Sequence, residues 1–535
     1  MKVNFNDKKF LLVEDSPLMR ATIRGILSRI SVRIVYEAKN AEMALMAMRK
    51  ERFDIVLCDY NLGEGQNGLQ LLEEAKFCKL LSHNAIFIMV TADNTQSMVL
   101  GVMENKPDDY LLKPFNAIQL INRLKKQALI KKFTFNIGKA LDRDDLMLAI
   151  RHCDDLLRLN NHGMDTQLLK MRAELAIRVG DLHAAEQKFQ QVLHKRDLPW
   201  ARHGLGKIAL LQNNFDLAIE LFRQVIATTP MFLDSYDWLA RAYEATNQNE
   251  AALGILNQAA ELSPNSILRQ QKLAHIAIQS DQIDIAKKAF KVAVDLGKFS
   301  VHKSSYDFFK LVKIYLKGDD KKQVNKLLAD MRSQYGDDSE AQIQVAILEA
   351  EFYHAEKNVP MLTKAHEKID KMQSLMHDVC NDLQLNIAKT LLQTGSVKIA
   401  AGIINRLIIN NVDDEKFLNG VREIAKSSYD MEKLIEDSKQ ELLSINNTAV
   451  SLFREGNSAE ALAILVEATE KMPYNKTILL NMITILLMDM KTHGADKEKL
   501  SRAKTYIHKA DQLGVSQLKV NQLQLEFSKI AHSYY

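Results

Sequence analysis

The sequence predicts two folds in one chain: an α/β domain built on a five-stranded parallel sheet, followed by an all-α superhelical solenoid. Short apolar, β-rich runs alternate with helical segments up to Lys131 and are nearly absent afterwards. Part of the remaining chain contains a repeated sequence pattern typical of two consecutive helices. The repeat length equals the distance in sequence from Pro230 to Pro264. The 535 residues include only 20 glycines and 8 prolines, too few turn formers for a large all-β architecture.

The α/β domain is expected to contain five strands, each followed by a helix. Such an alternation favours a parallel sheet with helices on both faces, and apolar runs without strict alternation suit strands that are buried on both sides. The expected strands are Phe10–Val13, Val32–Tyr36, Ile55–Cys58, Ala85–Val90 and Tyr110–Leu112, and the expected helices are Pro17–Arg29, Ala41–Arg49, Leu69–Leu81, Thr95–Glu104 and Ala117–Lys131.

Polar residues follow four of the five apolar runs. Glu14 and Asp15 follow the first, Asp59 the third, Thr91 the fourth and Lys113 the fifth. Because ligands bind at the carboxyl ends of parallel strands, these side chains are expected to converge at one edge of the sheet. Clustered carboxylates need a cation among them, and hard oxygen ligands favour Mg²⁺. A lysine and a hydroxyl opposite could hold the oxygens of a phosphoryl group.

The simpler interpretation is that Asp15 only caps the helix that follows it. That interpretation explains the polar residue at one of the four strand ends and gives no reason for the polar residues at the other three. Residues 10–131 resemble the receiver domain of bacterial two-component response regulators. The segments FLLVEDSPLMR, FDIVLCDYNL, MVTA and DDYLLKPF carry the resemblance.

The resemblance implies a flavodoxin-like, doubly wound fold in which Asp59 accepts a phosphoryl group from a histidine kinase. It also implies that Glu14, Asp15 and Asp59, with the backbone carbonyl of Asn61, bind Mg²⁺. The loop after Asp59 departs from the family pattern, because Gly63 stands where a proline is usual. Gly68 comes one residue late. The shape of this loop, and with it the hydrolysis rate of the acyl phosphate, is left open.

The resemblance further assigns Thr91 and Lys113 to contact with the acyl phosphate and Tyr110 to the role of switch aromatic. It implies a cis peptide bond before Pro114. In this family, Thr91 would move toward the phosphoryl group and Tyr110 would fill the vacated space. The plainer interpretation of Tyr110 is a side chain that packs in the core.

The helical part of the chain resembles tetratricopeptide (TPR) repeats. Leu205-Gly206, Ala209, Ala218, Phe222 and Pro230 recur one interval later as Leu239-Ala240, Tyr243, Ala252, Leu256 and Pro264. Small residues let two antiparallel helices approach closely, and a larger side chain fills the space beside them. A coiled coil would instead require heptads.

These patterns predict six segments. They are a receiver domain (1–131), a helical linker (132–145), TPR-like repeats (146–300), divergent helical repeats (301–445), further TPR-like repeats (446–515) and a C-terminal capping helix (516–535). The linker leaves two alternatives open, because a continuous helix would couple the two parts rigidly and a hinge near Phe133–Gly138 would separate them.

A groove that binds a partner is expected on the first helix of each repeat. Lys207, Arg241 and His275 follow one another at the same interval as the repeats and could form a basic row for an acidic partner. The alternative is ordinary solvated surface charge. His203 stands where a carboxylate-binding TPR would carry an asparagine, which argues against recognition of a chain terminus.

Together these features predict a signalling adaptor rather than an enzyme. The only chemistry expected of this adaptor is phosphorylation and dephosphorylation of its own receiver. The predicted protein target is not identified, and a phosphate sink that drains a kinase is the alternative. A nucleic-acid-binding regulator is disfavoured by the net charge of +4. No apolar stretch reaches the length of a membrane span, and four scattered cysteines fit a cytoplasmic protein. A homodimer is left open.

Overall fold

The computed structural model describes residues 4–92, 95, 100–101, 104–159, 164–372, 381–425 and 429–534. It divides into two compact units, Met1–Leu311 and Val312–Tyr535, and the boundary between them falls within one helix. Most of the helix expected over Thr95–Glu104 lies outside the described residues, although residues 100, 101 and 104 are helical.

The chain begins with the predicted parallel sheet. All neighbouring strands pair in parallel, in the order β2-β1-β3-β4-β5. The strands are β1 (Lys9–Val13), β2 (Ile34–Ala38), β3 (Ile55–Asp59), β4 (Ile86–Thr91) and β5 (Asp109–Leu112). The predicted α/β fold class is therefore confirmed, and the carboxyl ends of β1, β3, β4 and β5 lie at one edge.

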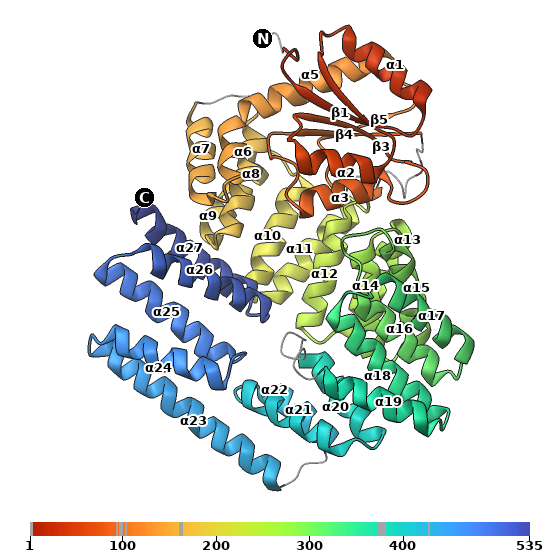
Figure 1. Cartoon of the computed structure of the whole chain (residues 1–535). Helices are drawn as coiled ribbons and strands as arrows, with labels where there is room; N and C mark the ends of the chain where they lie inside the picture. Colours follow the sequence, from red (N-terminus) through yellow and green to blue (C-terminus); the bar gives the residue numbers. More distant parts are fainter. Residues whose placement is uncertain are drawn as a thin grey trace. The chain divides into compact units, whose positions relative to one another are not determined.

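Helices cover both faces of the sheet, with α1 and α5 on one face and α2 and α3 on the other (Figure 1). Their bounds are α1 (Pro17–Ser28), α2 (Ala41–Lys50), α3 (Gly68–Phe77) and α5 (Ala117–Phe133). Alternate strand residues enter the two layers, since Leu11 and Val13 pack with α2 while Phe10 and Leu12 pack with α1. This double burial explains why the strand segments are continuously apolar.

Most elements lie within two residues of their expected bounds, and two of the differences have a clear local cause. The second strand begins two residues later than expected, because Ser31 has a φ of 60° and the Val32 amide donates to the Leu27 carbonyl, so Val32 belongs to the turn after α1. The helix expected over Leu69–Leu81 ends at Phe77, since Lys79 has a φ of 52° and the Leu80 amide bonds back to the Ala75 carbonyl.

The linker contains a break between two helices. Helix α5 ends at Phe133, and Thr134 separates it from α6 (Phe135–Leu141). The Asn84 side-chain amide donates to the Phe135 carbonyl at 3.1 Å, and the His83 amide donates to Asp142 at 2.8 Å. These contacts hold α6 against the loop before β4, so in this structure the break is a fixed bend.

Antiparallel helix pairs follow within the first unit. Helix α7 (Leu146–Arg158) packs with α6, and the next pairs are α8 (Asp165–Arg178) with α9 (Leu182–Lys195), α10 (Pro199–Leu211) with α11 (Phe215–Thr228), α12 (Leu233–Ala245) with α13 (Asn249–Leu262) and α14 (Ile267–Gln279) with α15 (Ile283–Gly297). The pairing requires small residues at the crossing points. A Cβ added at Gly206 would lie 2.7 Å from the ring of Phe222, which is fully buried.

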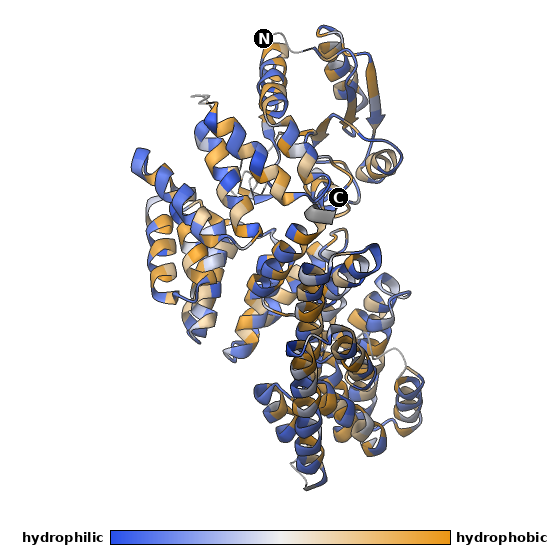
Figure 2. Ribbon diagram, turned by 90° about the vertical axis from the view of Figure 1, so that its left-hand side faces the viewer, coloured by the Kyte–Doolittle hydropathy of each residue, from blue (hydrophilic) through white to orange (hydrophobic). Residues whose placement is uncertain are grey.

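The remaining chain is also helical. Its helices are α16 (Ser305–Lys317), α17 (Lys321–Gln334), α18 (Ser339–Ala355), α19 (Val359–Lys371), α20 (Asn381–Gln393), α21 (Val397–Asn410), α22 (Glu415–Ala425), α23 (Tyr429–Arg454), α24 (Ser458–Lys471), α25 (Lys476–His493), α26 (Lys497–Gln512) and α27 (Gln517–Tyr534). Orange and blue residues alternate along these helices, as amphipathic helices require (Figure 2). Helix α23 runs without interruption across residue 446, where the sequence had placed a boundary between two groups of repeats.

Within the part of the chain that the structure describes, no helix is both long and apolar enough to cross a membrane.

One buried carboxyl in the repeats gives a test of stability against pH. Asp307 of α16 is 2% exposed and accepts a hydrogen bond from the Gln271 amide at 2.7 Å. Burial raises its pKa from 3.8 to about 6. The folded state thus binds this proton more tightly than the unfolded state, so the stability that Asp307 contributes is complete below the unfolded pKa and is lost as the pH rises through about 6.

We expect Asp307→Asn to remove that loss. The variant should gain about 2 kcal/mol in unfolding free energy near neutral pH, and the gain should shrink toward about pH 4. Denaturant unfolding followed by circular dichroism at several pH values measures it. Asp284→Asn, on an exposed position of α15, should keep the pH dependence of the unmodified chain, and an Asp307→Asn chain with that same dependence would contradict the assignment.

Candidate functional site: the acidic edge of the sheet

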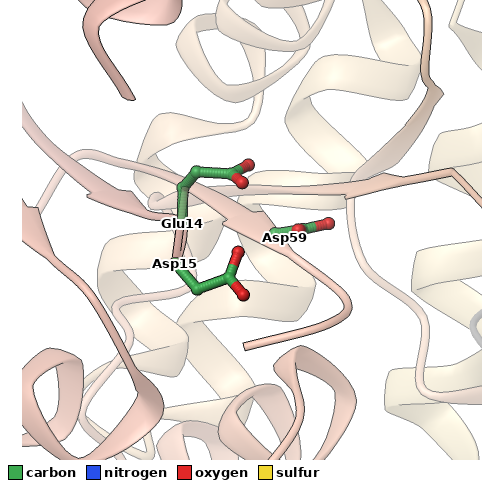
Figure 3. A group of neighbouring side chains, drawn as sticks. All are labelled: Glu14, Asp15 and Asp59. Atoms are coloured by element: carbon green, nitrogen blue, oxygen red, sulfur yellow. The ribbon is translucent and has the colours of Figure 1, made fainter. Parts of the chain in front are cut away.

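Three carboxylates meet at the carboxyl edge of the sheet. Glu14 and Asp15 follow β1, and Asp59 is the last residue of β3. One oxygen from each lies within 4.8 Å of the others, and the three side chains point toward one another (Figure 3). Glu14 and Asp59 are buried, whereas Asp15 is exposed, so the cluster is open to solvent on the side of Asp15.

A lysine that directly follows β5, at the edge of the sheet, closes the buried side of this cluster. The Lys113 ammonium lies 2.8 Å from Glu14 and 3.0 Å from Asp59. The Lys113 amide donates to the Thr91 carbonyl at 2.7 Å, which continues the pairing of β5 with β4. The peptide bond between Lys113 and Pro114 is cis. Thr91, at the end of β4, is 3% exposed.

Burial governs the protonation of the cluster. It raises the pKa of both Glu14 and Asp59, although hydrogen bonds from Lys113 oppose the rise. Burial also disfavours the charged form of Lys113, but its hydrogen bonds to the two carboxylates prevail and raise the pKa of the ammonium. Three acids and one base thus share a site with an excess of negative charge, which an added cation would relieve.

The donor set fits a hard divalent cation. It consists of carboxylate oxygens, which Mg²⁺ and Ca²⁺ prefer, with an open side that leaves room for water. Asn61 lies two residues beyond Asp59, and its side-chain oxygen accepts from the Gly63 amide at 3.3 Å, so the side chain is engaged within the loop. The Asn61 side chain thus does not compete with its backbone carbonyl for a place in the site.

The loop after Asp59 is shaped by glycines. Gly63 and Gly65 have φ values of 79° and 102°, which only glycine adopts readily. Asn67 then caps α3, and the Gly68 amide donates to the Tyr60 carbonyl at 2.8 Å. A Cβ added at Gly68 would lie 2.1 Å from the backbone oxygen of Asp59. The departures noted in the sequence therefore belong to one turn that passes directly beneath Asp59.

Tyr110 lies on β5, opposite Met89 of β4. Its ring packs against the apolar layer beneath α2 and α3 while remaining partly exposed. The Arg123 guanidinium of α5 lies 5.8 Å from the centre of the ring. This position combines core packing with access to the surface, and the switch role implied by the family resemblance stays a prediction.

The sequence analysis missed Arg20. Its guanidinium donates to the backbone carbonyls of Glu14 and Asp15, at 3.0 Å for the latter, and so holds the acidic pair in place. Arg20 is the last residue of the FLLVEDSPLMR segment, in the first turn of α1, where its side chain can reach back to the loop before the helix.

Comparison with known proteins shows which family of domains carries such an acidic edge. Residues 10–125 match the model of the response regulator receiver domain. The chemotaxis protein CheY of Bacillus subtilis is 30% identical over 118 residues, which cover 95% of that protein and 22% of this chain. The chain belongs to the response regulator family. Chemotaxis protein CheY-3 of Vibrio cholerae is 29% identical over 118 residues, covering 89% of its length and 22% of this chain.

The helical part of this response regulator has its own match. Residues 170–230 and 203–267 fit the tetratricopeptide repeat model, which confirms the TPR interpretation for α8 to α13. Among solved structures, residues 41 to the end of MamA from Desulfovibrio magneticus RS-1 align with 23% identity and a TM-score of 0.27, covering 31% of this chain and 93% of that one.

The basic row expected in the TPR groove stays a prediction, and the surroundings of its three residues differ. The Lys207 ammonium and the Arg241 guanidinium each lie 4.7 Å from the centre of the Trp238 ring, so these two cations share one aromatic side chain. His275 stacks instead on Tyr306, with ring centres 5.6 Å apart. His203 is buried and pairs with the Ser235 hydroxyl at 2.9 Å, so it belongs to the packing between repeats.

Proposed function

We propose that this response regulator is a phosphorylation-controlled adaptor: Asp59 accepts a phosphoryl group from a histidine kinase, and the TPR repeats bind a protein partner in a way that depends on it. The observation that carries the proposal is the location of the receiver's acidic edge and the first repeats in one compact unit. Receiver residues between Thr91 and Tyr110 contact the repeats within it.

The phosphoryl transfer assigns a role to each side chain at the edge. A carboxylate oxygen of Asp59 attacks phosphorus, the phosphorus–nitrogen bond to the kinase histidine breaks, and the imidazole leaves with the electron pair. Lys113, which already bridges Glu14 and Asp59, stabilises the phosphoryl oxygens electrostatically. Mg²⁺ held by Glu14, Asp15, Asp59 and the Asn61 carbonyl would supply the remaining positive charge. Arg20 positions the acidic pair.

The signal then passes along β4 and β5. In the proposed switch, the Thr91 hydroxyl turns toward the phosphoryl group and Tyr110 moves into the space that it leaves. The phosphoryl group can change partner binding only by stabilising one of the two arrangements more than the other. A complete reversal of populations requires roughly 5.5 kcal/mol of such preference.

The proposal is tested by capture of partners on the full-length chain, with and without beryllofluoride and Mg²⁺ as a mimic of the acyl phosphate. We expect a protein that is retained in one state only, and an Asp59→Asn chain that retains it equally with and without the mimic. Equal capture in both states, or capture of a kinase alone together with rapid dephosphorylation, would instead support a phosphate sink.

A further inference from the structure

Helix α3 and receiver residues Leu100, Glu104 and Lys106 contact the repeats within the first unit. Leu100 is 6% exposed and packs with Leu233, Tyr236 and Ala259. The Gln66 amide of the loop before α3 donates to the Phe299 carbonyl at 2.8 Å, and the Lys106 ammonium lies 3.1 Å from Asp234. The receiver is thus held to α12, α13 and the end of α15 by one apolar contact and by the hydrogen bond and ion pair beside it.

A buried arginine lies at the centre of this contact. The Arg269 side chain of α14 is 1% exposed and bonds Asp237 through two nitrogens, at 2.8 and 3.0 Å. Its Nη2 also pairs with Glu104 of the receiver. The second carboxylate oxygen of Glu104 accepts from the Ser263 hydroxyl at 2.8 Å. Both oxygens of this receiver carboxylate are therefore used by the repeats.

This arrangement depends on a carboxylate at the position of Glu104. A buried guanidinium is stable only when its charge is balanced and its donors are paired. Asp237 balances the charge of Arg269, so loss of Glu104 would leave donors of the guanidinium unpaired rather than an uncompensated charge. Asp237 supplies one carboxylate. Glu104 supplies the other, and it comes from a residue 165 positions away in the chain. If the receiver moves away, the repeats present a guanidinium that needs a new acceptor.

The receiver residues that contact the repeats also show which side chains fit this surface. Residues 100 and 104 are both helical, and a separation of four places their side chains on one face. Leu100 fills the apolar contact and Glu104 reaches Arg269. The occupant therefore carries an apolar residue and, four positions later, a carboxylate.

We propose that the surface formed by Leu233, Tyr236, Asp237, Ser263 and Arg269 is the docking site for an acidic segment of the partner protein, and that Leu100 and Glu104 of the receiver occupy it as a tethered competitor. This inference rests on the proposed function and names the partner's chemistry. Arg241 lies beside the same site, on a cavity of about 240 Å³ that Glu104, Asp237 and Arg269 also line. Asp234 and Asp237 of the repeats also line this cavity and balance its two arginines, so the preference for a carboxylate rests on the pairing of Arg269 with Glu104.

The test uses the full-length chain and a fluorescent peptide with the sequence TQSMVLGVMENKPD, which is residues 95–108. Glu104→Gln in the chain should weaken the receiver's own hold, because the neutral amide cannot pair with the guanidinium charge. We expect this variant to bind the peptide about tenfold more tightly than the unmodified chain, measured by fluorescence anisotropy. A peptide that carries the same Glu104→Gln change should bind about tenfold more weakly.

Two arginine variants provide the matched comparison. Arg269→Lys, combined with Glu104→Gln, keeps a cation beside Asp237 but removes the forked pairing, and it should lose the preference for the acidic peptide. Arg332→Lys, combined with the same Glu104→Gln, alters an arginine paired with Glu349 in the second unit and should retain the preference. Circular dichroism spectra that match the parent chain verify that each variant is folded.

The outcomes separate this inference from the proposed function. Equal binding of both peptides to the Glu104→Gln chain would overturn the docking site, even if beryllofluoride still switched partner capture. Tighter binding of the acidic peptide than of its Glu104→Gln form to that chain supports the docking site. If beryllofluoride then fails to raise peptide binding by the unmodified chain, the site stands and phosphorylation control of it is wrong.

Discussion

The Asp59→Asn chain is expected to take up no phosphoryl group from a small phosphodonor such as acetyl phosphate in the presence of Mg²⁺. Asparagine has nearly the same shape as aspartate but its amide cannot form an acyl phosphate. Asp59 ends β3 with its carboxylate 3.0 Å from Lys113, so the residues that would stabilise the product are already in place. Intact-protein mass spectrometry over a time course measures the uptake, and we expect a loss of about a hundredfold or more.

Asp54 provides the control for this substitution. It precedes β3 at the opposite edge of the sheet, where it pairs with Lys8 at 2.7 Å, so the two aspartates flank the same strand. Asp54→Asn should be phosphorylated like the unmodified chain. Uptake by the Asp59→Asn chain at the unmodified rate would mean that another carboxylate accepts the group, and the roles of Glu14 and Asp15 would have to be assigned again.

The acidic edge was predictable because each of its residues directly follows a buried strand. In a parallel sheet that local pattern fixes a shared location, so Glu14, Asp59 and Lys113 could be placed together without knowledge of the rest of the chain. The repeats were predictable for a similar reason, since the small residues that recur at a fixed interval report the helix crossings.

The features that the sequence did not predict depend on contacts with distant residues. Leu80 and Leu81 continue the apolar pattern of α3 after the helix has ended, because they pack against the core from a turn. The pairing of Glu104 with Arg269 joins residues 165 positions apart, and neither residue stands out locally. The surroundings of His275 were also not predicted, because Tyr306, from the following repeat, stacks on its ring.

The loop beneath Asp59 shows how a departure from the family pattern is accommodated. The sequence left the effect of Gly63 and the late Gly68 open. In the structure both belong to a turn in which Gly63 adopts a positive φ and Gly68 approaches the Asp59 backbone. The approach is possible only without a side chain at residue 68, and that requirement gives the second large expected effect.

We expect Gly68→Ala to destabilise the receiver by about 3 kcal/mol, at the upper end of the usual cost of overpacking. The added Cβ would lie 2.1 Å from the Asp59 carbonyl oxygen and 2.9 Å from the Cys58 sulfur. Neither a strand backbone nor a buried cysteine can move aside cheaply, so either α3 or the end of β3 must shift. A shift of β3 would also move the Asp59 carboxylate away from Lys113, and phosphorylation should slow.

Gly25→Ala is the matched control, in the same domain and also in a helix. A Cβ there would meet nothing within 4 Å, so this change should stabilise α1 by about 0.5–1 kcal/mol through lower backbone entropy in the unfolded chain. Denaturant unfolding of the receiver transition compares the two variants. Equal midpoints would show that Gly68 does not approach the Asp59 backbone, and the turn would then not explain the late glycine. A lower midpoint for Gly68→Ala alone, with slower phosphorylation, ties the shape of this loop directly to the position of the phosphoacceptor.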